Sequence, residues 1–349
     1  MTVPRAPQRI GNTGVMPSTF STADAVDFAV LERNGFIESR HVGAAVVLAA
    51  DGSVVTGLGD ITSPIFPRST LKPFQALASM KAGVPLRGPQ VALAAASHVA
   101  SREHMDVVRT MLDAAGVTED HLQCPEDWPQ DEEARHELVR SGKGKQRIAF
   151  NCSGKHAAFL WACTENGWDT ATYLDPTHPL QRSVASVIEE YTEESVAAWG
   201  VDGCGAPVAA VSLTGLARGI GKIAKAPSDK HADARAATIA TAMLDYPWAV
   251  HGHGMENSVV MEDLGVLAKS GAEGVLVLAA PTGATLALKI LDGNARAATL
   301  VGLTLLAASG AIDAEKVGAT LEKVVSPILG GGRSVGSLRL AAPVLSLLD

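Results

Sequence analysis

Residues 68–75 read Arg68-Ser69-Thr70-Leu71-Lys72-Pro73-Phe74-Gln75 and place a lysine three positions after a serine. Residues three apart share a face of a helix, so the spacing predicts that the Ser69 hydroxyl and the Lys72 amine can touch. S-x-x-K is the arrangement of enzymes that acylate a serine with a lysine as base. Serine is a weak nucleophile unless a neighbour takes its proton. A lysine suits that role when its pKa falls from about 10.4 to about 7–8, which corresponds to roughly 4 kcal/mol.

The same stretch has a plainer interpretation, in which Ser69 caps a helix and Lys72 is solvated in its first turn. The flanking residues favour the interpretation as a catalytic serine and lysine. Prolines at 64, 67 and 73 fix how the chain enters the helix, and the residues that follow are apolar. We therefore expect a buried active-site helix from Ser69 to about Ala82.

Two further segments fit the same chemistry. Lys269-Ser270-Gly271 precedes a strand expected at 275–280, and in S-x-x-K enzymes a K-[ST]-G element supplies a second cation beside the nucleophile. Ser97-His98 is the candidate third element. Alone, Lys269 is better explained as a loop lysine, and Ser97-His98 has the alternative explanation of a helix C-terminus. Their order along the chain favours a serine acyl-enzyme.

Two glycine-bearing turns carry cysteines, at 150–156 and 202–205. Cys152 and Cys204, together with His156, have the donor types of a zinc site, although they do not form a C-x-x-C pair. Free buried thiols are the alternative. His251 and His253 are a weaker candidate ligand pair.

Predicted strands lie towards both ends of the chain. The turn at Asp51-Gly52 predicts a hairpin from 42–58, and Pro281-Thr282-Gly283 predicts a second from 274–291. Residues 156–250 are mostly helical in pattern, and further helices are expected at 296–309 and 313–326. The pattern predicts an α+β fold, with a mainly antiparallel sheet built from both chain ends and a helical insertion.

For domain organisation, we expect a flexible tail over residues 1–27 and a single two-lobed domain over 28–349. The composition is 47% hydrophobic but only 4% aromatic, which predicts a large core of Ala, Val and Leu.

The charge balance argues against several partners. With 29 basic and 37 acidic residues the net charge is −8, and no basic stripe is present, so nucleic acid and anionic membranes are not expected to bind. The sequence has neither a secretory h-region nor an apolar run of the ~18 residues that a membrane span needs. Four cysteines in 349 residues favour a reducing compartment, and we expect a cytoplasmic protein.

Together the motifs resemble the bacterial L-asparaginases of the Rhizobium type, the asparaginase II family. The resemblance covers roughly residues 29–340. It is carried by Arg68-Ser69-x-x-Lys72-Pro73-x-Gln75, Ala96-Ser97-His98, Asn151-Cys152-Ser153-Gly154-Lys155-His156, Asp202-Gly203-Cys204, Lys269-x-Gly271-Ala272-Glu273-Gly274, Lys289-x-x-Asp292-Gly293 and Arg333-x-Val335-Gly336.

The resemblance implies a fold like that of serine β-lactamases and glutaminases, hydrolysis of L-asparagine to L-aspartate and ammonia, and a homodimer. It also implies roles for individual residues. Two serine–lysine pairs would be catalytic, three residues would bind Zn²⁺, and we expect three more to contact substrate. The catalytic pairs are Ser69 with Lys72 and Ser97 with Lys269. The zinc ligands are Cys152, Lys155 and Cys204. The substrate contacts are Arg68, Asp202 and His156.

Two segments depart from the family pattern, 251–257 and Gly330-Gly331-Gly332. They leave other functions open. One is another S-x-x-K hydrolase acting on glutamine, an ester or a β-lactam. The other is a zinc- or amino-acid-binding protein without catalysis. A catalytic zinc, rather than an activated serine, is the competing mechanism.

Overall fold

The fold is built on an antiparallel sheet. The computed structural model describes residues 18–348. Its eight-stranded sheet has the order β6-β7-β8-β2-β1-β10-β9, and β3 pairs with β2. The strands are β1 Val26–Arg33, β2 Phe36–Leu48, β3 Val54–Leu58, β6 Leu267–Gly271, β7 Val275–Ala279, β8 Thr285–Ile290, β9 Ile328–Gly330 and β10 Arg333–Leu340.

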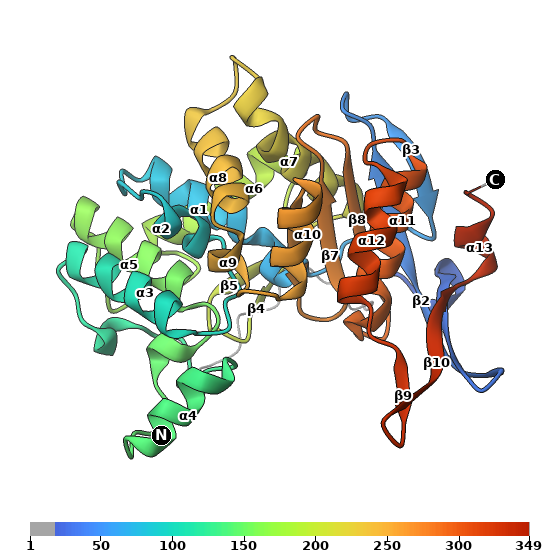
Figure 1. The fold of residues 1–349 in the computed structure, drawn as a ribbon. Helices are drawn as coiled ribbons and strands as arrows, with labels where there is room; N and C mark the ends of the chain where they lie inside the picture. The colour runs from blue at the N-terminus through green and yellow to red at the C-terminus, as the bar shows by residue number, and fades with distance from the viewer. Residues whose placement is uncertain (1–17, 349) are drawn as a thin grey trace.

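The two ends of the chain meet in this sheet. Ala29 of β1 is paired with Leu340 of β10, and Gly43 of β2 with Ile290 of β8. The chain between β3 and β6 forms a mainly helical lobe, and one of its helices, Leu213–Lys225, also packs on the sheet (Figure 1). The prediction of an α+β fold with a two-ended sheet and a helical insertion is therefore confirmed.

The helical lobe carries most of the helices and a small second sheet. Its helices are α1 Lys72–Lys81, α2 Pro89–Ala94, α3 Arg102–Ala114, α4 Glu132–Arg140, α5 Ser153–Asn166, α6 Pro179–Thr192, α7 Leu213–Lys225, α8 Ala234–Asp245, α9 Pro247–Val250 and α10 Glu256–Leu264. The small sheet pairs β4 Ala198–Val201 with β5 Pro207–Ala210. The last three helices are α11 Ala298–Ala308, α12 Ala314–Val324 and α13 Ala342–Leu345.

Helices cover both faces of the sheet at β7 and β8. Gly302 of α11 faces Leu286 and Leu278, whereas Gly221 of α7 faces Thr285. Successive strand residues point to opposite faces, so α7 and α11 lie on opposite sides of β8. Every residue of β7 and β8 is buried as a result. Each fully buried leucine contributes roughly 1.5–3 kcal/mol, so this three-layer packing holds β6 and its lysine firmly in place.

The predicted tail over residues 1–27 extends too far along the chain. Ser21 caps a short helical turn at Thr22–Asp24, Phe20 is buried, and β1 already begins at Val26. Residues 18–27 are thus part of the fold, and residues 1–17 lie outside the described residues. The prediction missed β1 because it did not use the turn at Asn34-Gly35, both with positive φ, which closes the β1–β2 hairpin.

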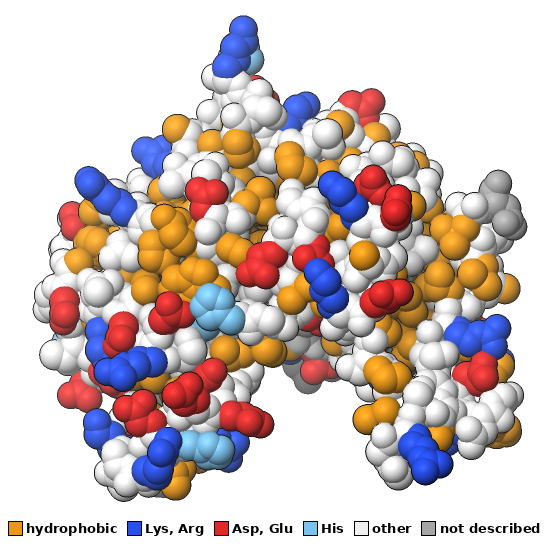
Figure 2. Space-filling model, viewed as in Figure 1, with side chains coloured by type: hydrophobic (Ala, Val, Ile, Leu, Met, Phe, Trp, Pro, Cys, Tyr) orange, Lys and Arg blue, Asp and Glu red, His pale blue; other side chains and the backbone are white. Residues whose placement is uncertain are grey.

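Other predicted elements are confirmed. The hairpins at 42–58 and 274–291 are β2–β3 and β7–β8, and the late helices are α11 and α12. Gly331 and Gly332 form the turn between β9 and β10. No helix within residues 18–348 is long and apolar enough to cross a membrane. Acidic and basic side chains are interspersed on the face shown in Figure 2.

Candidate active site

Ser69 lies in a tight turn that leads into α1. Residues Arg68–Leu71 form a 3-10 turn, and the N–H of Lys72 donates to the Ser69 carbonyl. In such a turn side chains three apart lie directly above one another, so Ser69 and Lys72 share a face as predicted. Ser69 does not cap the helix, however, because the residue before α1 is Leu71. Arg68, just before the serine, has φ 54°, a left-handed conformation that costs an arginine on the order of 1–3 kcal/mol.

Lys72 does not bond to the Ser69 hydroxyl. Its Nζ instead donates to the Ala96 carbonyl and, at 2.8 Å, to Ser97 Oγ. Lys269, in the middle of β6, also has its Nζ 2.8 Å from Ser97 Oγ and donates to the Ser270 carbonyl. Both lysines are only 1% exposed. Ser97 therefore joins two other predicted catalytic residues, Lys72 and Lys269. The fourth, Ser69, lies one turn before Lys72.

The environment of Lys269 favours its neutral amine. Burial, with a smaller contribution from the charge of Lys72, holds the pKa of Lys269 well below its usual range. A neutral amine has a lone pair and can accept a proton, which an ammonium group cannot. Lys269 is thus equipped to act as a base beside Ser97.

A glycine at the end of β6 brings that strand close to the Ser69 turn. A Cβ at Gly271 would lie 2.6 Å from the Pro67 carbonyl and 3.4 Å from the Ser69 backbone N. Real Cβ atoms do not approach a carbonyl that closely, so only glycine fits here without a shift. The Lys269–Gly271 strand can therefore pack directly on the serine turn.

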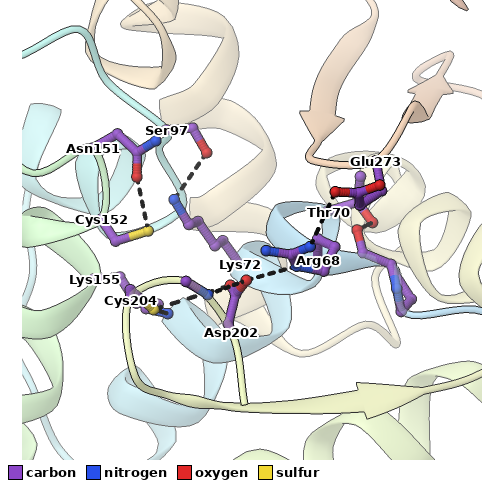
Figure 3. A network of polar contacts seen from close by, with 12 residues as sticks. Arg68, Thr70, Lys72, Ser97, Asn151, Cys152, Lys155, Asp202, Cys204 and Glu273 are labelled. Carbon is purple, nitrogen blue, oxygen red and sulfur yellow. Dashed lines mark hydrogen bonds and ion pairs between the residues drawn. The ribbon is translucent and has the colours of Figure 1, made fainter. Parts of the chain in front are cut away.

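Arg68 and Asp202 form an ion pair in front of this turn. Arg68 Nε donates to Asp202 Oδ1 at 2.7 Å, and its NH1 lies 4.0 Å from Glu273 Oε1 (Figure 3). A cavity of about 240 Å³ is lined by Arg68, Glu273 and Lys289, among others. A larger cavity, of about 490 Å³, is lined by none of the predicted site residues. Of the predicted site residues, only Arg68 lines the smaller cavity. Arg68 directly precedes Ser69, so this cavity is the candidate substrate site.

The cysteines and a buried lysine form a second group beside the first. Lys155 Nζ donates to Cys204 Sγ at 3.0 Å, and Cys152 Sγ donates to Asn151 Oδ1 at 3.1 Å (Figure 3). Cys152 directly precedes α5, and Lys155 lies in the first turn of that helix. Cys204 comes from the turn after β4, which also holds Asp202. That turn therefore connects the two groups.

Charge separation stabilises this second group. The neighbouring Cys152 thiol and the charge of Lys155 hold the pKa of Cys204 well below its usual range, although burial opposes them. The pKa of Lys155 is raised, because attraction to Cys204 outweighs burial. Without a metal, the pair is an ammonium facing a thiolate.

His156 belongs to this second group and not to a substrate surface. It is fully buried, and its Nδ1 lies 2.7 Å from the Tyr173 hydroxyl. Its Nε2 is buried without a hydrogen-bond partner within the described part of the chain. The predicted contact of His156 with substrate does not fit this burial.

A sequence model of the L-asparaginase II family matches residues 29–340 of the 349. The chain belongs to the L-asparaginase II family. No curated protein matches it. Membership over nearly the whole chain supports L-asparaginase-type amidohydrolase activity, with L-asparagine as the substrate that the family implies.

Sequence reasoning missed some residues of this L-asparaginase II site. Tyr173, the partner of His156, lies in an irregular segment with no local motif. His251 had been considered only as a weak metal ligand. Its carbonyl accepts the Val99 N–H at 2.9 Å, so it lies beside the loop that carries Ser97. Its pKa is lowered to about 4, mainly by burial. The histidine-rich segment 251–253 was its only signal.

Proposed function

We propose that the protein hydrolyses L-asparagine to L-aspartate and ammonia through an aspartyl ester on Ser69. The observation that carries the proposal is Ser97 Oγ, which lies 2.8 Å from both Lys72 Nζ and Lys269 Nζ. Two buried ammonium groups on one hydroxyl would repel each other, and the hydroxyl proton would have no acceptor. One neutral lysine removes both problems, and the depressed pKa assigns that role to Lys269.

The proton path follows from this assignment. Ser97 first gives its hydroxyl proton to the neutral Lys269, and Lys72 replaces that proton with one of its own. The Lys72 amine that this frees then takes the proton from Ser69 Oγ as the oxygen attacks the carboxamide carbon. The reverse path then protonates the departing ammonia. Water hydrolyses the ester by the same relay. This differs from the sequence-based hypothesis in one respect, because the neutral lysine is Lys269 and not Lys72.

Backbone and charged groups around Ser69 supply the remaining interactions. The Ser69 N–H lies in the first turn of a helix, where no carbonyl of its own turn can accept it, so it can donate to the developing oxyanion. Arg68 and Asp202 would exchange part of their mutual ion pair for the α-carboxylate and α-ammonium of the substrate.

The second group fits a zinc ion. Two thiols are ordinary donors for Zn²⁺, and an amine can bind once it has lost its proton. The buried, unpartnered Nε2 of His156 belongs to the residue four positions after Cys152. Within residues 18–348 no three His, Cys, Asp or Glu side chains are grouped to hold a metal, and here a lysine provides the third donor. Cys152, Lys155 and Cys204 would hold the ion after Lys155 loses its proton. When bound, zinc would neutralise the thiolates and fix the turn that carries Asp202.

The test is ammonia release from L-asparagine by wild type, Ser69→Ala and Ser97→Ala, with zinc content measured on each sample. We expect both zinc-replete variants to lose activity by on the order of 10²-fold or more. High turnover by a zinc-replete Ser69→Ala variant would refute the serine mechanism.

Parallel assays with L-glutamine, a simple ester and a chromogenic β-lactam test the alternative substrates. If the enzyme hydrolyses one of these three compounds and not L-asparagine, that compound class becomes the assigned substrate. The homodimer and the cytoplasmic location remain proposals from the resemblance and the cysteine content.

A further inference from the structure

The loop that carries Ser97 is held by backbone hydrogen bonds at four consecutive positions, three of them to partners outside the loop. Its backbone N–H groups all have partners: Ser97 with the Val250 carbonyl at 2.9 Å, His98 with the Asn151 carbonyl at 3.2 Å, Val99 with the His251 carbonyl at 2.9 Å, and Ala100 with His98 Nδ1 at 3.1 Å. Ala100 has φ 57°, a left-handed conformation that a non-glycine residue adopts only when its surroundings enforce it. The position of Ser97 therefore depends on these partners.

The hydrogen atoms of His98 can be assigned from its contacts. Nδ1 accepts the Ala100 N–H, so it carries no proton. Nε2 lies 3.0 Å from Ser153 Oγ, and that hydroxyl already donates to the Ile148 carbonyl at 2.8 Å. The Nε2–H of His98 must therefore be the donor to Ser153. Burial holds the pKa of His98 well below its usual value, so the ring stays neutral and in this tautomer.

His98 is thus bonded twice to the segment that begins α5. One bond runs from its backbone to Asn151, and the other from its ring to Ser153. Between these two residues lies Cys152, and Lys155 follows within the same helical turn. A shift of this segment is transmitted to His98, and so to its neighbour Ser97, whose hydroxyl joins the two lysines.

We propose that His98 is a positioning residue that couples the metal group at Cys152, Lys155 and Cys204 to Ser97 in the acyl site. The inference rests on the proposed function, because it needs both a zinc site and a substrate site. Zinc would stabilise one position of residues 151–153. Through the bonds of His98 to this segment, it would also stabilise one position of Ser97. Coupling between two sites is reciprocal, so a carboxylate ligand in the acyl site must change zinc affinity by the same factor.

The test measures zinc affinity, by competition with a chelating dye, with and without saturating L-aspartate, the reaction product. In wild type we expect L-aspartate to tighten zinc binding by about 5–10-fold, a common size for coupling. Ser153→Ala removes the acceptor of the His98 ring but no zinc donor. We expect the factor to fall below about two-fold in this variant, while zinc and L-aspartate each still bind. His98→Leu should do the same, and His98→Gln, whose amide can both donate and accept, should restore part of the factor.

His104→Gln is the matched control. His104 is buried and stacks on His98 at 5.1 Å, but it bonds to Ser101 and Trp248 and not to residues 151–153. It should retain the wild-type factor. The inference is overturned if Ser153→Ala and His98→Leu keep that factor, or if wild type binds both ligands without any coupling. Wild type that binds no zinc or releases no ammonia would instead refute the proposed function, and the inference with it.

Discussion

At the scale of single residues, the central feature is one hydroxyl between two buried lysines. The spacing of Ser69 and Lys72 predicted that they share a face, and they do. It could not predict where Lys72 Nζ points, because a lysine side chain has many rotamers of similar energy. Ala96 and Ser97 determine that direction, and they come from a different part of the chain.

Replacing the neutral lysine should abolish the proton relay. We expect Lys269→Met to lower kcat by on the order of 10²–10⁴-fold, because Ser97 loses its proton acceptor. Lys269→Arg should be as damaging, since an arginine stays protonated at any working pH. Steady-state ammonia release measures both.

Lys143→Met, at an exposed lysine, is the control and should behave as wild type. A Lys269→Arg enzyme with more than about a tenth of wild-type kcat would show that Lys269 acts only through its charge and not as a base.

At the scale of elements, the site depends on close packing of the β6 end on the Ser69 turn. Gly271 makes this contact possible. Lys269-Ser270-Gly271 is recognisable in the sequence as a motif, but the sequence places it before the strand expected at 275–280. In the structure these three residues are part of the edge strand β6. Strand pairing depends on long-range partners, here β7, and a five-residue segment with a lysine and three small residues has weak strand propensity.

A methyl group at this contact should damage both stability and activity. Gly271→Ala places a Cβ 2.6 Å from the Pro67 carbonyl, so the turn must move. We expect a loss of about 1–3 kcal/mol in the free energy of unfolding, measured by urea denaturation, with a fall in kcat as the Ser69 N–H shifts.

Gly318→Ala is the matched control. Gly318 lies in α12 with no atom within 4 Å of an added Cβ, so alanine should stabilise the helix by about 0.5–1 kcal/mol. Equal effects of the two substitutions on stability would contradict the close-contact argument.

Across the candidate site, short motifs could be recognised from the sequence, whereas contacts between distant segments could not. Cysteine, lysine and serine motifs supplied most of the candidate residues, because each motif is contiguous in the sequence. The links between motifs were not predictable. His98 reaches Ser153, and Cys204 reaches Lys155, only because the helical lobe folds these segments together. Such contacts follow from tertiary packing and leave no periodic pattern.

At the scale of the whole molecule, the core encloses several histidines in neutral form. His104 and His251 both have a pKa lowered to about 4 from 6.5, mainly by burial. Below pH 6.5 the unfolded chain therefore binds protons that the folded chain does not. The free energy of unfolding must then decrease as the pH falls from about 6.5 towards 4.

His104→Gln should flatten this dependence. Each such histidine contributes a slope of up to about 1.4 kcal/mol per pH unit, and glutamine does not titrate. Urea denaturation of wild type and variant at a series of pH values between about 4.5 and 7 measures the difference. An unchanged slope in the variant would mean that His104 is protonated in the folded protein.

The pairing of β1 with β10 also has a consequence for how the protein is made. A ribosome releases β1 and β2 first and must synthesise the entire helical lobe before β8 and β10 can pair with them. During that interval both strands expose unpaired edges, which are the usual sites of aggregation. Newly made chains should therefore depend on chaperones. A chain terminated before β10 should form insoluble material and not a smaller working enzyme.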